Sequence, residues 1–122
     1  MDLNLKDRKV IITGAGDGIG RTIALTFAKE GAKVAVCARS QDRLDSLAGE
    51  IEGKGHLFYS ADLGTAKGVE TFHENVMKKL GQVDVLVNNV GAILKLANFF
   101  ELTDQDWENS FQINLMSAVR LS

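Results

Sequence analysis

Hydrophobic and polar positions form two alternating patterns along the chain. Short runs rich in apolar and β-branched residues occupy positions 10–13, 33–38, 56–61 and 83–87. Each run is followed by a longer stretch in which apolar residues recur every three or four positions, as they do on one face of a helix. Short, nearly continuous apolar runs are typical of strands that are covered on both faces. The pattern therefore predicts the element order βαβαβαβα.

Residues that begin and end helices lie where this interpretation needs them. Ser40 is a candidate N-cap for the second helix, and Gly31 and Gly81 follow the last periodic residues of the first and third helices. The segment 103–106, with sequence TDQD, resembles a capping box, in which the first and fourth residues satisfy backbone N–H groups at a helix start. The helix that it opens carries Trp107, Phe111, Leu115 and Val119.

The element order defines a fold class. Parallel strands that are joined by helices need right-handed crossovers, which place helices on both faces of the sheet. With the first strand in the centre, we expect the strand order 3-2-1-4 in a Rossmann-type, doubly wound α/β domain. We expect residues 1–122 to form one such domain, without a repeat or a linker. The last helix is still in progress at Ser122, so we expect the second half of the sheet to be missing from this chain.

The sequence TGAGDGIG joins the first strand to the first helix. The plain dinucleotide fingerprint G-x-G-x-x-G does not fit, because isoleucine or arginine stands where its last glycine would fall. The pattern that does fit is T-G-x-x-x-G-x-G, on Thr13, Gly14, Gly18 and Gly20. We expect Gly14 to turn the chain off the strand, Gly18 to let a pyrophosphate approach the backbone, and Gly20 to allow close helix–sheet packing.

The position of this turn before a helix indicates what it binds. A helix N-terminus offers unpaired N–H groups and a partial positive charge to a phosphate. Gly16 lies outside the minimal pattern and is expected to ease the turn. A flexible strand-to-helix turn without a ligand is the alternative. The strand before the turn and the amphipathic helix after it favour nucleotide binding.

Composition excludes several other classes of protein. The chain is 45% hydrophobic and 25% charged with a formal net charge of −2, so it has no basic field for nucleic acid or an anionic membrane. Its polar N-terminus lacks the apolar segment of a signal peptide, and we expect a cytoplasmic protein. Cys37, the single cysteine, excludes an internal disulfide and is expected to be buried in a strand. His56 and His73 have no partners at metal-binding spacing and are expected at the surface.

Three ordered segments resemble the classical short-chain dehydrogenase/reductase family: TGAGDGIG at 13–20, DVLVNNVG at 84–91 and QINLMSAVRLS at 112–122. The resemblance covers essentially all of this chain and about the first half of a usual family member. It implies an NAD(P)-binding domain of an oxidoreductase. The positions expected to bind the cofactor are Thr13, Gly14, Gly16, Asp17, Gly18, Ile19, Gly20, Arg39, Ser40, Asp62, Leu63, Asn89 and Gly91.

The end of the second strand suggests which dinucleotide binds. Rossmann domains that bind NAD place an acidic residue about 20 positions after the glycines, where it holds the ribose 2′-hydroxyl. Here Arg39 and Ser40 stand at that point, and a guanidinium with a neighbouring hydroxyl suits a 2′-phosphate. NADP(H) is therefore expected, with NAD as the other possibility because the acid Asp17 in the glycine turn does not favour a phosphate. The alternative is a solvated Arg39 beside a serine that only caps a helix.

Two further strand ends carry candidate binding residues. In the family, a pair such as Asp62 and Leu63 touches the adenine, whereas the alternative is a turn-forming aspartate beside a core leucine. Asn89 and Gly91 follow the fourth strand at the carboxyl edge of the sheet, where such folds bind ligands. The family has alanine where Val90 stands. A structural asparagine turn is the alternative, and both roles are compatible.

The resemblance implies one catalytic residue in this chain. Asn114 matches the asparagine of the family's Asn-Ser-Tyr-Lys set, which supports a proton-relay water. The alternative is a polar residue on a solvated helix face. The serine and the Tyr-x-x-x-Lys pair of that set have no counterpart here, because the only tyrosine, Tyr59, is followed four positions later by Leu63. We therefore expect this chain alone to be inactive.

Two functions of different class are compatible with these residues. The first is the cofactor-binding part of an NADP(H)-dependent oxidoreductase that acts on a small carbonyl or alcohol substrate, and the resemblance implies a homo-oligomer. The second is a non-catalytic nucleotide-binding or interaction module with the same fold. A Tyr-x-x-x-Lys pair encoded after Ser122 would decide for the enzyme.

Overall fold

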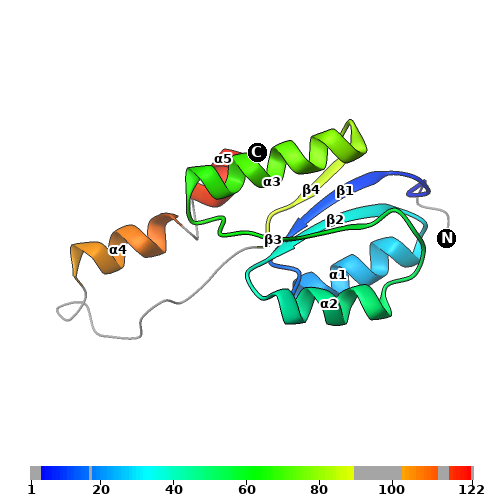
Figure 1. The fold of residues 1–122 in the computed structure, drawn as a ribbon, viewed down its shortest axis with the longest axis horizontal. Coiled ribbons are helices and arrows are strands. Elements are labelled where there is room, and N and C mark those ends of the chain that lie inside the picture. Colours follow the sequence, from blue (N-terminus) through cyan, green and yellow to red (C-terminus); the bar gives the residue numbers. More distant parts are fainter. Residues whose placement is uncertain (1–3, 17, 90–102, 113–115, 122) are drawn as a thin grey trace.

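The described residues form a four-stranded parallel sheet with helices on both faces (Figure 1). The computed structural model describes residues 4–16, 18–89, 103–112 and 116–121. The sheet has the order β3-β2-β1-β4, so the predicted fold class and strand order are confirmed. The elements are β1 (Lys9–Thr13), α1 (Gly18–Lys29), β2 (Lys33–Ala38), α2 (Gln41–Glu50), β3 (Leu57–Ser60), α3 (Ala66–Leu80), β4 (Val85–Val87), α4 (Asp104–Phe111) and α5 (Ser117–Leu121).

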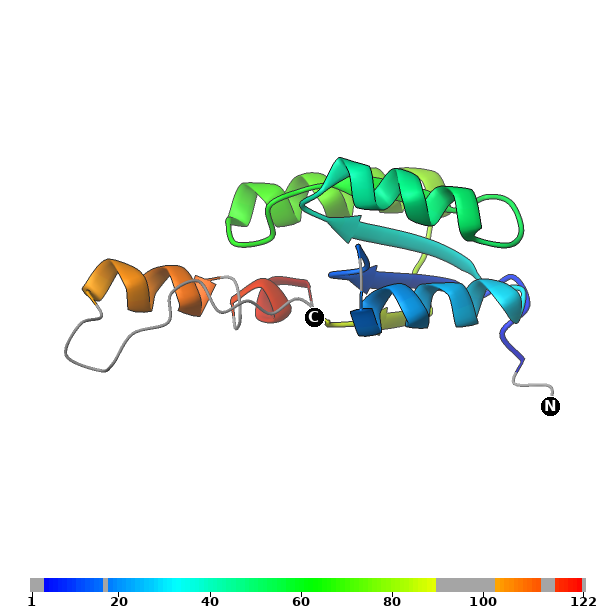
Figure 2. The ribbon, with the colours of Figure 1, turned by 90° about the horizontal axis from the view of Figure 1, so that it is seen from below.

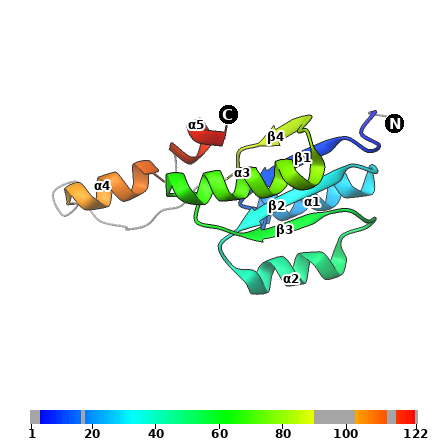
Figure 3. The same cartoon turned by 45° about the horizontal axis from the view of Figure 1, so that its top comes forward.

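Alternate residues of the central strands supply two separate cores. Val10 and Ile12 of β1 pack with the buried leucines of α2 and with Ala24 of α1 on one face. Ile11, between them, packs on the other face with Phe72 and its neighbours on α3. Helices α1 and α2 therefore cover one face and α3 covers the other (Figure 3). Helix α5 contacts α3, while α4 lies beyond the end of the sheet (Figure 2).

The predicted helix caps are confirmed. The Ser40 hydroxyl accepts the Arg43 N–H at the start of α2, 3.3 Å away. Gly81 ends α3 in the left-handed conformation, with φ 77°. Thr103 and Asp106 form the expected reciprocal capping box at α4.

The third and fourth strands begin later than predicted, and a side chain accepts a backbone N–H at each start. His56 Nδ1 accepts the Val34 N–H at 3.1 Å, and its Nε2 lies 2.7 Å from the Glu52 carbonyl. Asp84 Oδ2 accepts the Lys9 N–H at 2.8 Å. His56 was expected to be a simple surface residue; it is instead half-buried and joins β2 to the loop before β3.

The structure describes two parts of the last predicted helix, α4 and α5. Helix α4 ends at Phe111, and Gln112 still has right-handed helical angles, with φ −63° and ψ −47°. Helix α5 begins at Ser117 and packs on α3. Residues 113–115 between them lie outside the described residues.

Cys37 is buried in β2, as predicted, and burial raises the pKa of its thiol to about 12. At pH 8 we expect the native protein to resist an alkylating reagent, whereas the unfolded protein reacts as a free thiol does. The unfolded thiol ionises first as the pH rises through 9, so this residue lowers the free energy of unfolding progressively between pH 9 and 12. Mass spectrometry after timed alkylation checks this, and rapid labelling of the native protein at pH 8 would contradict it.

Candidate nucleotide-binding site

Thr13 fixes the end of β1 to the end of β4. Its side-chain hydroxyl donates to the Val87 carbonyl at 3.3 Å and accepts the Asn89 N–H at 3.0 Å. The residue is 1% exposed, so its polar group needs these partners. Thr13 therefore holds in place the backbone from which the glycine turn starts.

Gly14 and Gly20 are both required by close backbone approach. Gly14 has φ +67°, and its carbonyl accepts a hydrogen bond from Asn89 Nδ2 at 3.2 Å. A Cβ on Gly20 would overlap the Gly14 carbonyl oxygen and would lie 2.5 Å from Asn89 Nδ2. The start of α1 therefore packs directly on the turn. Asn89 has a structural role here, which leaves its proposed contact with a cofactor untested.

The other two glycines of the turn differ from each other. Gly16 is buried, and a Cβ there would lie 3.3 Å from the Cβ atoms of Ala38 and Arg43. Gly18 is exposed with φ +59°, and nothing lies within 4 Å of the position of its Cβ. Ile19 beside it is 73% exposed. The open backbone at the start of α1 fits a phosphate group, since the N–H groups of a first helical turn have no partners within the helix.

Arg39 and Ser40 follow β2 at the same edge of the sheet. Arg39 is exposed, and its carbonyl accepts the Ser60 hydroxyl at 3.1 Å. The Ser40 oxygen accepts the Arg43 N–H, and the O–H of Ser40 can still donate to a ligand. The capping function predicted for Ser40 is therefore present, and a second function towards a phosphate is compatible with it.

Asp62 and Leu63 follow β3 and form a turn. Asp62 Oδ1 accepts the Gly64 N–H at 2.9 Å, and the Asp62 carbonyl accepts the Thr65 hydroxyl at 3.2 Å. Leu63 is 2% exposed and belongs to the core under α3. These contacts support the structural alternative for both residues and do not test contact with adenine.

Three predicted positions lie outside the described residues, and one structural glycine was not predicted. Asp17, Gly91 and Asn114 are the predicted site residues that the structure does not describe. Gly68 was missed: a Cβ there would overlap the Asp62 carbonyl oxygen, so the start of α3 packs on the turn after β3. A glycine in the first turn of a predicted helix was the only sequence signal for this contact.

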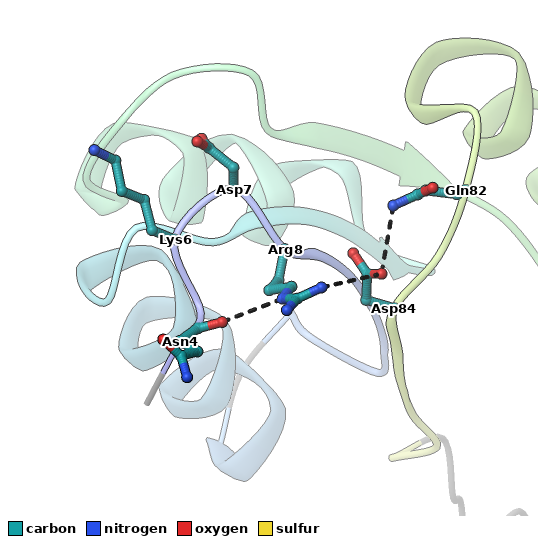
Figure 4. A pocket seen from close by; sticks show the side chains of 6 residues that line it. All are labelled: Asn4, Lys6, Asp7, Arg8, Gln82 and Asp84. Carbon is teal, nitrogen blue, oxygen red and sulfur yellow. Dashed lines mark hydrogen bonds and ion pairs between the residues drawn. The ribbon is translucent and has the colours of Figure 1, made fainter. Parts of the chain in front are cut away.

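The segments that precede β1 and β4 line a hollow of about 520 Å³ at the opposite edge of the sheet (Figure 4). Asp84 lies 4.0 Å from the Arg8 guanidinium and accepts a hydrogen bond from Gln82 at 3.4 Å, while Arg8 Nε donates to the Asn4 carbonyl. The side chains of Lys6 and Asp7 extend away from this network. These groups hold the starts of β1 and β4 together, and none points to the glycine turn.

The structure also bears on membranes and metals. Across the described residues, no helix is long and apolar enough to cross a membrane. The same part of the chain contains no group of three or more histidine, cysteine or acidic residues placed to hold a metal ion.

The strand order, the glycine turn and the open N-terminus of α1 at the carboxyl edge of β1 define a Rossmann-type domain. The family model of the short chain dehydrogenases matches residues 8–122. The chain therefore belongs to the short-chain dehydrogenase/reductase family, a family of oxidoreductases, and matches its N-terminal part.

Individual relatives agree with this assignment. An uncharacterized oxidoreductase of Bacillus subtilis, YvrD, is 41% identical over 100% of this chain and 46% of its own length. The crystal structure of L-sorbose reductase from Gluconobacter frateurii, complexed with NADPH and L-sorbose, superposes with a TM-score of 0.89 at 35% identity, covering 99% of this chain and 47% of that one. The 3-ketoacyl-(acyl-carrier-protein) reductase of Brucella melitensis, complexed with NADH, gives 0.86 at 33% identity, covering 96% and 48%. The chain thus spans about half the length of these relatives.

Proposed function

We propose that residues 1–122 form the cofactor-binding part of an NADP(H)-dependent oxidoreductase that transfers hydride between nicotinamide and a carbonyl or alcohol substrate. One observation carries the proposal. The exposed, left-handed Gly18 opens the start of α1 to a phosphate, at the same sheet edge where Arg39 follows β2. The pairing of a diphosphate position with a cation at the adenosine end fits a dinucleotide that carries a 2′-phosphate.

Each of the predicted site residues is assigned to one part of the dinucleotide or to the shape of the turn. The N–H groups that begin α1 face the diphosphate, and the exposed Ile19 covers it from the side. Asp62 and Leu63 are assigned to the adenine, and Asn89 and Gly91 to the ribose on the nicotinamide side. Arg39 and Ser40 are assigned to the 2′-phosphate, while Thr13, Gly14, Gly16 and Gly20 shape the turn. The acid Asp17 reduces the preference for that phosphate.

The bound nicotinamide would supply the hydride, and this chain would supply positioning. Asn114 is assigned a catalytic function, in which its amide holds a water molecule that relays a proton. Tyr59, the only tyrosine, lies on β3 four positions before the buried Leu63, so it does not provide a tyrosine–lysine acid/base pair. We therefore expect this chain by itself to bind the cofactor without turning over substrate.

Similarity supports a small-molecule substrate without identifying it. The L-sorbose reductase was crystallised with a sugar and NADPH, and the 3-ketoacyl reductase with NADH. This proposal includes a carbonyl or alcohol substrate, a cytoplasmic location and a homo-oligomeric assembly. It includes no binding to nucleic acid or to membranes.

Replacing Arg39 by alanine tests the proposed cofactor. A hydrogen bond to a charged group contributes about 1.5–3 kcal/mol, so Arg39→Ala should weaken NADPH binding by about 10- to 150-fold and leave NADH almost unchanged. Because Arg39 is exposed, the loss should be largest at low salt. Titration of both cofactors against the wild type and the variant, followed by NADPH fluorescence, measures this.

Arg8→Ala is the matched control, since it removes the same charge at the opposite edge of the sheet. It should affect neither cofactor. A wild type that prefers NADH, or an Arg39→Ala variant that loses both cofactors equally, would show that Arg39 does not recognise a 2′-phosphate. Absence of any nucleotide binding would contradict the proposed function itself.

A further inference from the structure

The side chain of Arg43 lies along the glycine turn. Measured from the position that a Cβ of Gly16 would take, Arg43 Cβ is 3.3 Å away and Arg43 Cδ is 3.4 Å away. The aliphatic part of the arginine, from Cβ to Cδ, therefore follows the buried backbone of Gly16. Arg43 as a residue is exposed, so part of it remains accessible beyond this contact.

The cap of α2 fixes this arrangement. Ser40 accepts the Arg43 N–H, which places Arg43 in the first turn of α2, directly after the end of β2. The starts of α1 and α2 lie at the same end of the sheet (Figure 1). Arg39 and Arg43 lie on either side of the capping residue Ser40, so the short segment 39–43 carries two guanidinium groups. Asp42 is the acidic residue of the same helical turn.

We propose that Arg43 is a second specificity-determining cation for the 2′-phosphate of NADP(H), and that Gly16 is the residue that positions it. The inference rests on the proposed function and extends it to a residue that no sequence motif singles out. A guanidinium beside the turn adds a fork of N–H donors for a phosphate. Because the stem of Arg43 already lies against the backbone, less side-chain freedom is lost when the phosphate binds.

This inference also explains Gly16. The pattern T-G-x-x-x-G-x-G does not require a glycine at this position, and Gly16, unlike Gly14 and Gly18, does not have a left-handed backbone. Its Cβ position instead abuts Arg43 and Ala38, each at 3.3 Å. A side chain at position 16 would therefore displace the arginine stem from the turn.

Binding of phosphate-bearing and phosphate-free ligands tests the inference without any enzymatic activity. The probes are NADPH and NADH, together with 2′,5′-ADP and 5′-AMP, titrated by calorimetry. Arg43→Ala should weaken NADPH and 2′,5′-ADP by about 3- to 10-fold, less than Arg39→Ala, because an exposed charge is partly screened. NADH and 5′-AMP should bind as to the wild type. Arg43→Lys should retain part of the affinity, since it keeps the charge but not the planar fork.

The outcomes separate this inference from the proposed function. If Arg39→Ala weakens NADPH selectively while Arg43→Ala does not, Arg43 is no phosphate ligand and the proposed function stands. An equal loss of NADPH and NADH in Arg43→Ala would show a structural role only, and would also overturn the inference. If the wild type binds no dinucleotide, the proposed function fails first. Arg8→Ala again controls for the change in net charge.

A double-mutant cycle tests the positioning by Gly16. Gly16→Ala should reduce the ratio of NADPH to NADH affinity when Arg43 is present. In the Arg43→Ala background, the same substitution should leave the ratio unchanged, because the group that it displaces has been removed. Equal effects in both backgrounds would show that Gly16 does not act through Arg43.

Discussion

Gly20→Ala should destabilise the protein by about 3 kcal/mol, because the new methyl group overlaps backbone that cannot rotate away. The methyl would meet the Gly14 carbonyl oxygen and, at 2.5 Å, the Asn89 side-chain nitrogen. Relief requires the start of α1 to move away from the turn, so the geometry offered to a diphosphate should be lost as well. We expect the melting temperature to fall by about 10 °C for a chain of this size. Thermal unfolding by circular dichroism, with and without NADPH, measures both effects.

Gly49→Ala is the matched control for this prediction. Gly49 lies in α2, and nothing is within 4 Å of the position of its Cβ. Alanine favours a helix over glycine by about 0.5–1 kcal/mol, so this variant should be slightly more stable than the wild type. If the two alanine variants melted at the same temperature, the close approach of Gly20 to the turn would not matter for stability.

Asn114→Ala should lower kcat by about 10²-fold in the complete polypeptide that the gene encodes, as expected for the loss of assistance to proton transfer. The melting temperature should barely change. Steady-state turnover of NADPH with a panel of ketones, beside a thermal melt, separates the two quantities. This prediction depends on the proposed catalytic function of Asn114.

Asn109→Ala provides the control on the preceding helix. Asn109 is exposed and its side-chain oxygen accepts a hydrogen bond from Gln105 four residues earlier, at 2.7 Å. Loss of this surface contact should change neither turnover nor melting. If Asn114→Ala left kcat unchanged, or if unfolding explained the whole loss, Asn114 would have no catalytic function.

The local signals in this sequence predicted the fold well. The strand order and the caps at Ser40, Gly81 and Thr103 were all predicted correctly. Each of these caps depends on residues within a few positions of one another, so the residues that form the cap can be recognised in the sequence itself. The strand order follows in turn from the alternation of elements and the fixed hand of the crossovers.

The contacts that were missed join segments that are distant in the sequence. The sequence suggests that Gly20 packs closely, but not that it meets Asn89, nor that Gly16 meets Arg43. The starts of β3 and β4 were misplaced for the same reason. His56 reaches back to Val34, and this pairing depends on the register between neighbouring strands rather than on local propensity.

The link between Thr13 and Asn89 has a consequence for how the protein folds. The hydrogen bonds of Asn89 to Thr13 and Gly14 span 76 and 75 positions. Formation of β1, α1 and β2 is therefore not enough to give the glycine turn its final shape. The turn is completed only when β4 has docked against β1. Contacts of such long range are slow to form, because the intervening chain must first be ordered. A nucleotide that requires the finished turn would then bind only chains in which β4 is paired with β1, and would draw the folding equilibrium towards them.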